Sequence, residues 1–365
     1  MRFDAVVIGA GFAGSVAART LAEKGKKVLI IEKLKHLAGH CHDCRNESGI
    51  MTHTYGPHIF HTNYQDVWDF LNRFSEFRLY QHKVLSYVEG NFVPFPINRD
   101  TIKNIFDENI SVNQMEAFFK TEVRNSSFQN PPQNFRDVVV SQVGERIYDL
   151  FYKNYTIKQW QVDPEELSTE LANRIPIRSN RDYRYFTDRY QGIPKIGYTK
   201  LVEKIVDHQN ISVLLNADYF DYKMDLQADQ IVYTGELDRY FDYKYGKLEY
   251  RSLKLEFTTE KQEWYQPSAV VNYPNDYDWT RITEFKHMTG EISNTTTLCY
   301  EYPKSTGEPY YIVMNQRNIN LRQKYWEEAQ KDKHVIFIGR LAQYQYFNMD
   351  QVIKEVFLKL QALEK

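Results

Sequence analysis

The first thirty residues combine two apolar runs with a segment of helical periodicity between them. Phe3–Ile8 and Val28–Ile31 are apolar runs of strand length. Between them, apolar residues recur at three- and four-residue steps, as at Val16, Ala17 and Leu21. The pattern predicts a strand–helix–strand unit at the N-terminus.

The pattern becomes helical between about residues 100 and 170. Ser111 and Gln114 are spaced as in a capping box, which predicts the start of a helix there. Further on, an amphipathic stripe at three- and four-residue steps is formed by Val139, Val143, Ile147, Leu150 and Phe151.

Strands are predicted from about residue 175 to 325, where short, tyrosine-rich runs are separated by turn clusters such as 275–278. One more apolar run, Val335–Ile338, ends on Gly339 and Arg340. The order of elements therefore indicates an α/β unit, a helical region, a strand-rich region and a final strand.

Length and composition restrict the class of protein. The 365 residues are enough for two or three domains, and 42% hydrophobic with 26% charged residues indicates a globular chain. A net charge of −2 argues against a nucleic-acid-binding protein, which normally has a basic face. No apolar run approaches about 18 residues, so no membrane span is expected. Three cysteines do not form a disulfide framework and no signal-peptide pattern is visible, so we expect a cytoplasmic protein.

The first turn has the chemistry of a dinucleotide site. Gly9, Gly11 and Gly14 form G-x-G-x-x-G directly after the first strand. Such glycines allow a tight turn and close approach of the backbone to a pyrophosphate at the helix N-terminus. Glu32 follows the second strand, where a carboxylate accepts from both ribose hydroxyls and repels a 2′-phosphate. NADP is therefore disfavoured.

The fingerprint alone does not distinguish NAD from FAD. Two features favour FAD. The unit stands at the extreme N-terminus, and Gly39 lies in a following loop that could approach the same pyrophosphate. The late strand ending at Gly339 and Arg340 could return to complete the site.

Residues 40–62 are rich in possible metal ligands, namely His40, Cys41, His42, Cys44, His53, His58 and His61. Cys41 and Cys44 form C-x-x-C, but no second pair of ligands follows at the separation of a zinc finger. We therefore expect no metal and interpret these residues as loop or cofactor contacts; the alternatives are a structural zinc and a redox-active C-x-x-C.

Arginines and tyrosines accompany one another in the second half of the chain, at Arg174, Arg178, Arg281, Tyr185, Tyr310, Tyr311, Tyr344 and Tyr346. Guanidinium groups match phosphate oxygens, and phenols donate hydrogen bonds to them. These residues could hold a second pyrophosphate or be solvated surface residues, and their sequence positions leave both interpretations open.

Eight short segments along the whole chain carry a family resemblance: Tyr55–Thr62 (YGPHIFHT), Tyr155–Trp160 (YTIKQW), Arg174–Arg178, Tyr185–Phe186, Gln191–Pro194, Thr280–Glu284, Glu308–Tyr311 and Gly339–Leu341. In this order they resemble the UDP-galactopyranose mutase family of bacterial type. The resemblance implies an α/β fold in which an N-terminal Rossmann-like FAD-binding domain is combined with a helical insertion and an antiparallel β-sheet domain. It places the FAD-binding domain at 1–75, 195–245 and 325–365, the helical domain at 98–170, and the sheet domain at 76–97, 171–194 and 246–324.

The resemblance also implies an activity. Members are isomerases that interconvert the pyranose and furanose forms of a nucleotide sugar, here most simply UDP-galactose, through an adduct between the sugar and N5 of reduced FAD. The implied partners are the nucleotide sugar, a reductant such as NAD(P)H and a second subunit of a homodimer, and the implied process is cell surface polysaccharide biosynthesis. The alternatives are a mutase for a related nucleotide sugar and an FAD-dependent oxidoreductase of the amine-oxidase type. The latter would have no reason to keep Arg174 and Arg281.

Site residues follow from the same resemblance. The implied catalytic residues are Arg174 and Arg281, which clamp the diphosphate, and His58, beside the isoalloxazine. The implied cofactor contacts are Gly9, Gly11, Phe12, Ala13, Gly14, Glu32, Lys33, Gly39, His40, His58, Gly339, Arg340 and Met349. The implied substrate contacts are Phe151, Tyr155, Thr156, Gln159, Trp160, Arg174, Tyr185, Asn272, Arg281, Tyr311, Tyr346 and Asn348.

The chain departs from the family pattern at a few positions. His40 stands where members usually have asparagine, Asn348 where many have aspartate, and Asn154 where glycine is common. We expect the first change to alter packing only. The changes near the arginine clamp bear on the identity of the sugar and of the base.

Overall fold

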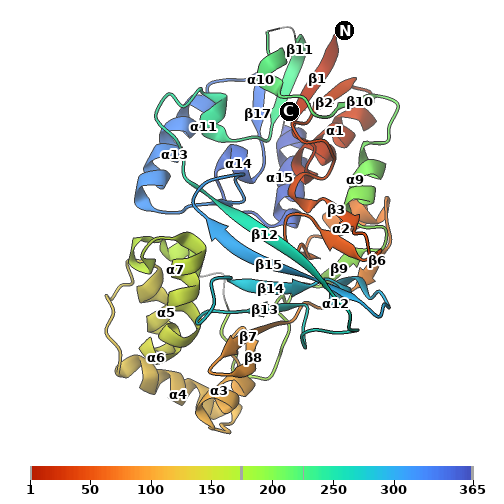
Figure 1. The fold of residues 1–365 in the computed structure, drawn as a ribbon. Helices are drawn as coiled ribbons and strands as arrows, with labels where there is room; N and C mark the ends of the chain where they lie inside the picture. The colour runs from red at the N-terminus through yellow and green to blue at the C-terminus, as the bar shows by residue number, and fades with distance from the viewer. Residues whose placement is uncertain (1, 173–175, 225, 363–365) are drawn as a thin grey trace. The chain divides into compact units, whose positions relative to one another are not determined.

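The computed structural model describes residues 2–172, 176–224 and 226–362. The chain divides into two compact units (Figure 1). Unit 1 consists of Met1–Tyr80, Asp188–Leu248 and Asn320–Lys365, and unit 2 of Gln81–Thr187 and Glu249–Ile319. Among the described residues, no helix is both long and apolar enough to cross a membrane.

Unit 1 is built on a five-stranded parallel sheet with strand order β10-β2-β1-β11-β17. Its strands are β1 (Phe3–Ile8), β2 (Val28–Ile31), β10 (Ile211–Leu214), β11 (Ala228–Tyr233) and β17 (Val335–Phe337). β1 and β2 have the predicted bounds, and β17 confirms the predicted late strand. Strands of a parallel sheet are covered on both faces, which explains why β1 reads as an uninterrupted apolar run.

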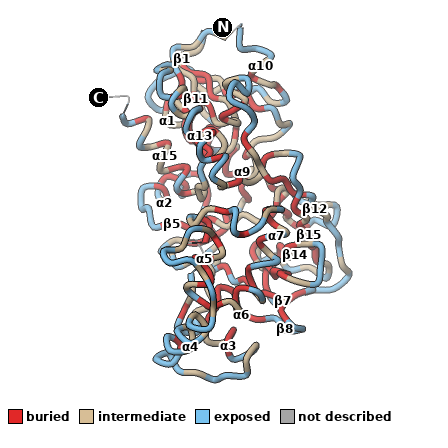
Figure 2. Tube along the Cα trace, turned by 90° about the vertical axis from the view of Figure 1, so that its left-hand side faces the viewer, coloured by how far each residue is buried: buried red, intermediate tan, exposed pale blue. Residues whose placement is uncertain are grey.

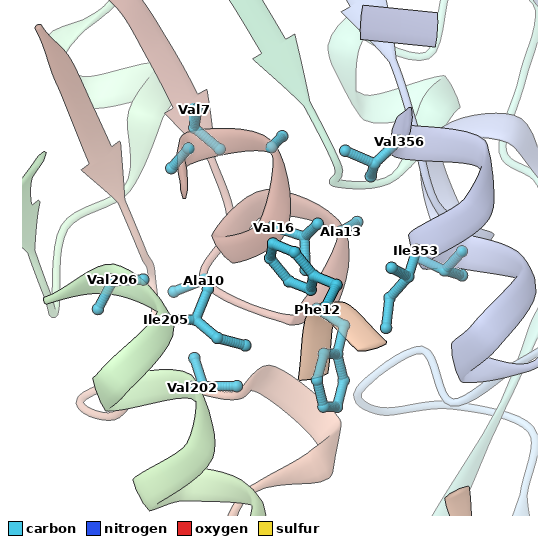
Figure 3. Close-up of a cluster of buried hydrophobic side chains, with 14 of the residues drawn as sticks. Val7, Ala10, Phe12, Ala13, Val16, Val202, Ile205, Val206, Ile353 and Val356 are labelled. Carbon is cyan, nitrogen blue, oxygen red and sulfur yellow. The ribbon is translucent and has the colours of Figure 1, made fainter. Parts of the chain in front are cut away.

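The longer helices that lie wholly within unit 1 are α1 (Phe12–Glu23), α2 (Gln65–Asn72), α9 (Tyr198–Val206) and α15 (Met349–Ala362). Helix α1 packs directly on this sheet, and α9 and α15 pack on α1. Figure 3 shows Phe12 and Val16 of α1 in one apolar cluster with Ile205 of α9 and Ile353 of α15. α1 is therefore held on several sides, and truncating a fully buried member such as Ile353 to alanine would cost about 2–5 kcal/mol.

Smaller elements complete unit 1. They are the hairpin β3 (Asp43–Arg45) and β4 (Met51–His53), the antiparallel sheet of β5 (Phe60–Thr62), β9 (Tyr190–Pro194) and β6 (Phe77–Leu79), and the helices α10 (Tyr219–Tyr222), α11 (Leu237–Tyr240) and α14 (Arg340–Gln343). α13 (Gln316–Ala329) begins in unit 2 and ends in unit 1.

Unit 2 contains a seven-stranded sheet with strand order β16-β12-β15-β14-β13-β7-β8. Its strands are β7 (Val84–Val88), β8 (Asn91–Phe95), β12 (Tyr250–Glu260), β13 (Val270–Asn272), β14 (Arg281–Glu284), β15 (Thr296–Lys304) and β16 (Tyr311–Ile312). All neighbours are antiparallel except β13 and β7. The prediction that strands here are short is wrong for β12 and β15, which have 11 and 9 residues. Polar residues along the exposed end of β12 break its apolar pattern without ending the strand.

The helical region of unit 2 consists of α3 (Arg99–Phe106), α4 (Val112–Arg124), α5 (Phe135–Val143), α6 (Glu145–Tyr148), a π-helical turn (Asp149–Lys153), α7 (Asn154–Trp160) and α8 (Thr169–Ala172). A further short helix, α12 (Lys286–Thr289), follows β14. The capping box is confirmed, because α4 begins after Ser111 and the Ser111 amide donates to Gln114 Oε1 at 2.8 Å. α4 is otherwise largely exposed (Figure 2).

The predicted amphipathic stripe crosses a break between helices. Gly144 has a φ of +82°, and a Cβ there would lie 2.6–2.9 Å from atoms of Glu122. The stripe is therefore carried by α5, α6 and the π-helical turn together. The further division of unit 2 into a helical and a sheet domain stays a prediction.

Candidate functional site

The turn between β1 and α1 contains the three glycines of the G-x-G-x-x-G motif. Gly9 has a φ of +99°, and its amide donates to the Ile31 carbonyl at 2.8 Å. A Cβ on Gly14 would lie 1.9 Å from the Gly9 carbonyl oxygen, so only glycine lets α1 approach β1 this closely. A Cβ on Gly11 would meet no atom within 4 Å. Gly11 therefore leaves room for a ligand at the turn.

α1 begins at this turn without a side-chain cap. Gly11 is the N-cap residue, and the first turn of the helix has no acidic side chain. The free N–H groups and the helix dipole favour an anion at this end. Phe12 and Ala13, both predicted cofactor contacts, are buried at the start of α1, and the Phe12 ring meets Tyr198 edge-on with centroids 6.1 Å apart.

Glu32 is held beside the same turn. Its Oε2 accepts from the Ala10 amide and its Oε1 from the Leu34 amide, both at 2.7 Å, and the residue is buried. Each carboxylate oxygen keeps a second lone pair, which a ribose hydroxyl can use. The neighbouring Lys33 forms an ion pair with Glu236 at 3.6 Å. The open glycine turn, the uncapped helix and the carboxylate together fit a dinucleotide.

The loop after β2 lies against the glycine turn. The Ala38 amide donates to the Ala10 carbonyl at 3.0 Å, and a Cβ on Gly39 would lie 3.2 Å from Gly11 Cα. The structure thus brings Gly39 to the turn. Cys41, two residues on, donates to Met349 Sδ at 3.6 Å, and burial raises the pKa of its thiol to about 12.

His58 and His53 are bonded to each other, because the His58 amide donates to His53 Nδ1 at 3.0 Å. Burial lowers the pKa of His58 to about 3, and His53, His40 and Arg340 lower it further. Burial also lowers the pKa of His53 to about 4. Both imidazoles are therefore neutral at pH 7, and His40 and Arg340 lie near His58.

The chain returns to this region at Gly339. A Cβ on Gly339 would lie 3.3 Å from Ala13 Cβ, in the first turn of α1. The Arg340 guanidinium lies 5.4 Å from the centroid of the Tyr346 ring. Asn348 precedes α15, and its amide donates to Gln351 Oε1 at 2.8 Å. Tyr346 and Asn348 belong to unit 1, whereas the other described residues predicted to contact the substrate belong to unit 2.

Arg281 lies in a row of polar side chains across the sheet of unit 2. The register pairs it with Asn272 on β13 and Glu301 on β15, and pairs Asn272 with Ser86 on β7. Directly paired residues point to the same face of a sheet. Arg281 Nε lies 3.2 Å from Glu301 Oε2, and Glu301 is fully buried. The row therefore contains one arginine with one acidic partner.

The surroundings of Arg281 keep it charged. Burial lowers the pKa of its guanidinium, but Glu301 and the phenols of Tyr155, Tyr311 and Tyr185 raise it, and the result lies well above the ordinary value. The structure therefore brings these three predicted tyrosines together around Arg281. Its terminal nitrogens donate no hydrogen bond to any residue within the described ranges. A permanently charged guanidinium with free donors and phenols nearby is suited to a phosphate group.

The remaining predicted substrate residues are on or just before α7. Phe151, Thr156, Gln159 and Trp160 are all buried. The Trp160 ring meets the Tyr311 ring at 69°, with centroids 6.2 Å apart. Gln159 Oε1 is a buried acceptor with no hydrogen-bond partner in the described part of the chain. A buried, unsatisfied amide oxygen is costly unless a ligand supplies the donor.

Three further cations of unit 2 donate to backbone carbonyls and were not among the predicted catalytic or substrate contacts, although Arg178 was one of the arginines considered for a second pyrophosphate. Arg251 donates to the Trp160 carbonyl at 2.5 Å. Arg178 is buried and donates to the carbonyls of Asp182, Arg184 and Tyr185. Lys158 donates to the carbonyls of Tyr273, Tyr277 and Trp279. Lys158 stands in the YTIKQW segment and Arg178 ends the Arg174–Arg178 segment, whereas no sequence signal pointed to Arg251. Arg174 lies outside the described residues.

Metal ligation finds no support where the structure describes the chain. No group of three or more histidine, cysteine, aspartate or glutamate side chains is placed to hold an ion in the described ranges. Cys41 is buried, Cys44 is exposed, and both are free thiols.

Two family models match the chain. The model described as UDP-galactopyranose mutase matches residues 150–346, and the model of the NAD(P)-binding Rossmann-like domain matches residues 7–74. These ranges include Arg281 with its neighbours Asn272 and Glu301, and the glycine turn, respectively.

Similar proteins extend over nearly the whole chain. A probable UDP-galactopyranose mutase of Klebsiella pneumoniae is 38% identical over 356 residues, which cover 96% of this chain and 92% of the relative. A dTDP-fucopyranose mutase of Escherichia coli is 35% identical over 361 residues, covering 96% and 95%. A crystal structure of reduced UDP-galactopyranose mutase shares the fold, with a TM-score of 0.79 at 19% identity over 100% of this chain and 95% of that one. The chain therefore belongs to the UDP-galactopyranose mutase family and is an intramolecular isomerase of that type.

Proposed function

We propose that the protein interconverts UDP-galactopyranose and UDP-galactofuranose, with FAD bound at the glycine turn of unit 1 and the nucleotide diphosphate bound at Arg281 of unit 2. The observation that carries the proposal is the charged Arg281 guanidinium with Tyr155, Tyr185 and Tyr311 around it. Similarity over nearly the full length to two sugar mutases supports the reaction class.

The diphosphate is the group that Arg281 would bind. Glu301 lies at Nε and leaves the two terminal nitrogens for phosphate oxygens. When the bond between the sugar and the diphosphate breaks, negative charge grows on the leaving oxygen. A fixed guanidinium then stabilises the transition state more than the ground state, which is the form of binding that accelerates a reaction.

The base is the group that Gln159 would bind. Its buried Oε1 needs a donor, and uracil offers one at N3. Thymine has the same N3–H, so Gln159 supports a uracil or thymine base and does not separate the two. The buried Phe151 and Thr156 would form the walls of this subsite.

The cofactor would be held by the donor set of unit 1. Pyrophosphate oxygens would accept from the N-terminal amides of α1, and the ribose hydroxyls would donate to Glu32. When bound and reduced, FAD supplies a nucleophilic nitrogen for the exchange of the sugar. His58, with a pKa of about 3, adds no positive charge near neutral pH.

A direct test is to incubate the reduced holoenzyme with UDP-galactopyranose and, separately, with dTDP-fucopyranose, and to separate pyranose from furanose products. We expect furanose from the UDP sugar, with many turnovers per equivalent of reductant because no electrons leave with the product. Consumption of one reductant per turnover would contradict the isomerase and favour an oxidoreductase.

A second candidate substrate is dTDP-fucopyranose, favoured by the Escherichia coli relative that is 35% identical. The thymine base of this substrate would bind Gln159, and its diphosphate would bind Arg281. If furanose forms from the dTDP sugar and not from the UDP sugar, the proposed substrate is wrong and the proposed reaction class stands.

A further inference from the structure

Lys158 connects α7 to the turn between β13 and β14. Its Nζ donates to the carbonyls of Tyr273, Tyr277 and Trp279, the last two at 2.9 and 3.1 Å. An ammonium group has three donors, and all three are used. One side chain thus gathers three carbonyls from a turn of about eight residues.

The turn is placed next to the polar row of the sheet. It begins directly after Asn272 and ends directly before Arg281, and the Tyr273 amide closes it by donating to the Thr280 carbonyl at 2.8 Å. The carbonyls bound by Lys158 therefore belong to the segment that carries both members of this pair. Any change in how Lys158 is bonded acts on the turn that precedes Arg281.

The periodicity of α7 separates two functions on neighbouring faces. Asn154 and Lys158 are four residues apart and share a face, and Asn154 Nδ2 donates to Asn275 Oδ1 of the same turn at 2.9 Å. Tyr155 and Gln159 are also four residues apart and share the adjacent face, rotated by about 100°. The bonds that Asn154 and Lys158 make to the turn therefore determine the direction in which Tyr155 and Gln159 point.

A second bond ties the turn to the segment before α7. Asn275 Nδ2 donates to the Leu150 carbonyl at 3.0 Å, in the π-helical turn. A π-helical turn leaves carbonyls without their usual helical partner, and such turns are frequent at functional sites. Asn154 stands where glycine is common in the family. Its side-chain bond to Asn275 is one that a glycine could not make.

We propose that Lys158 is a positioning residue, which fixes the rotation of α7 on the β13–β14 turn so that Tyr155 and Gln159 are presented to the nucleotide diphosphate together with Arg281. The inference rests on the proposed function of that site. Loss of the Lys158 bonds should weaken nucleotide binding, because a correctly placed binding group loses most of its effect when it is displaced by about 1 Å.

Protonation of Lys158 gives the inference a second readout. Burial lowers the pKa of Lys158 to about 8, although Asp278 and Asp276 raise it. These two carboxylates, on the turn, are the charged groups that face it, and carboxylates do not titrate near pH 8. Above about pH 8 the neutral amine has two donors for three carbonyls, so nucleotide binding should weaken as the pH rises.

The experiment compares Lys158→Met and Lys158→Arg with wild type as holoenzymes, using UDP and dTDP as probes in calorimetry and the sugar nucleotides in kinetics. We expect Lys158→Met to raise Kd and KM roughly tenfold or more with a much smaller change in kcat, and Lys158→Arg to recover most of the binding. The matched control is Lys153→Met, five residues earlier, whose side chain is half exposed and pairs with Asp149 at 3.2 Å. It should bind like wild type.

The pH profile decides the case if Lys158→Met fails to fold. Wild type should lose UDP affinity between about pH 7 and pH 8.5, below the range in which the uracil N3–H itself ionises, and Lys158→Arg should not, because arginine stays charged. Wild-type affinity in Lys158→Met, or the same pH profile in wild type and Lys158→Arg, would overturn the inference. If wild type itself binds neither UDP nor dTDP, the proposed function fails instead.

Discussion

The glycine turn of unit 1 and the Arg281 row of unit 2 are assembled in opposite ways. The first takes its turn, its helix N-terminus and Glu32 from the first 32 residues of the chain. The second takes its row from the neighbouring strands β7, β13, β14 and β15, and brings Tyr155, Tyr185 and Tyr311 to Arg281 from three further segments. One site is local, and the other depends on the register of a sheet.

The glycine turn depends on its backbone, whereas the Arg281 row depends on its side chains. At the glycine turn the absence of side chains matters, since a Cβ on Gly14 has no space. At the Arg281 row the side chains carry the chemistry, through a guanidinium and phenols. Substitutions in unit 1 should therefore act on the fold and on cofactor retention, and substitutions in unit 2 on binding and turnover.

The largest effect is expected for Gly14→Ala. Its Cβ would lie 1.9 Å from the Gly9 carbonyl oxygen and 3.0 Å from Val7 Cγ1, so α1 must move away from β1. We expect little folded, flavin-containing protein, measured as the yield and the visible absorbance after purification.

Gly11→Ala is the control for steric effects within the protein. Its Cβ meets no protein atom within 4 Å, so the thermal midpoint of the flavin-free form should stay near wild type while flavin occupancy falls. Equal stability of Gly14→Ala and Gly11→Ala would remove the distinction between packing glycines and a ligand-facing glycine.

Arg281→Ala should reduce kcat by several hundredfold, which corresponds to about 3–4 kcal/mol for one removed charged donor. The Kd for free UDP should rise by a smaller factor than kcat falls, because the interaction with Arg281 strengthens as charge develops on the leaving group. Arg281→Lys should rescue only in part, since an ammonium does not reproduce the guanidinium fork. Steady-state kinetics and calorimetry with UDP separate the two effects.

Arg178→Ala tests whether the effect belongs to Arg281 in particular. Arg178 is buried and donates to the backbone carbonyls of Asp182, Arg184 and Tyr185. We expect a lower thermal midpoint and a milder loss of kcat. A loss of kcat larger than in Arg281→Ala would show that the clamp is placed wrongly.

The sequence predicted the local site almost completely. The bounds of β1 and β2 are correct, and Glu32 lies beside the glycine turn because a parallel βαβ unit brings both strand ends to one edge. This geometry follows from a short stretch of backbone. The break at Gly144 was harder to foresee, because the apolar stripe keeps its spacing across it.

The distant site could not be predicted from periodicity. Nothing in the local pattern pairs Arg281 with Glu301, because strand register is set by long-range packing. The family resemblance named Arg281 with Tyr155, Tyr185 and Tyr311, and the structure brings these four together. It did not name Lys158, whose acceptors are backbone carbonyls and so have no side-chain signature.

Glu32→Ala should weaken flavin retention by roughly 1.5–3 kcal/mol, because the ribose hydroxyls lose a charged acceptor. The amides of Ala10 and Leu34 also lose their acceptor, so the flavin-free protein should become less stable. Glu32→Gln keeps one acceptor oxygen, and we expect it to restore most of the stability and less of the retention. Full flavin occupancy in both variants would contradict the ribose contact.

The smallest effect concerns acid stability, which we expect to depend on unit 1 through its buried histidines. Unfolding raises the pKa of His53 from about 4 and of His58 from about 3 toward the ordinary 6.5, so the unfolded chain binds more protons. The contribution of these two histidines to the free energy of unfolding is therefore fully present above pH 6.5 and is lost as the pH falls toward their folded-state pKa values. At one pH unit below 6.5 each histidine costs up to about 1.4 kcal/mol.

Denaturant unfolding of His53→Gln between pH 7 and about pH 5 should show a shallower loss than wild type, whereas His334→Gln, at an exposed position, should match wild type. Parallel pH profiles for wild type and His53→Gln would mean that another group in the protein governs acid stability.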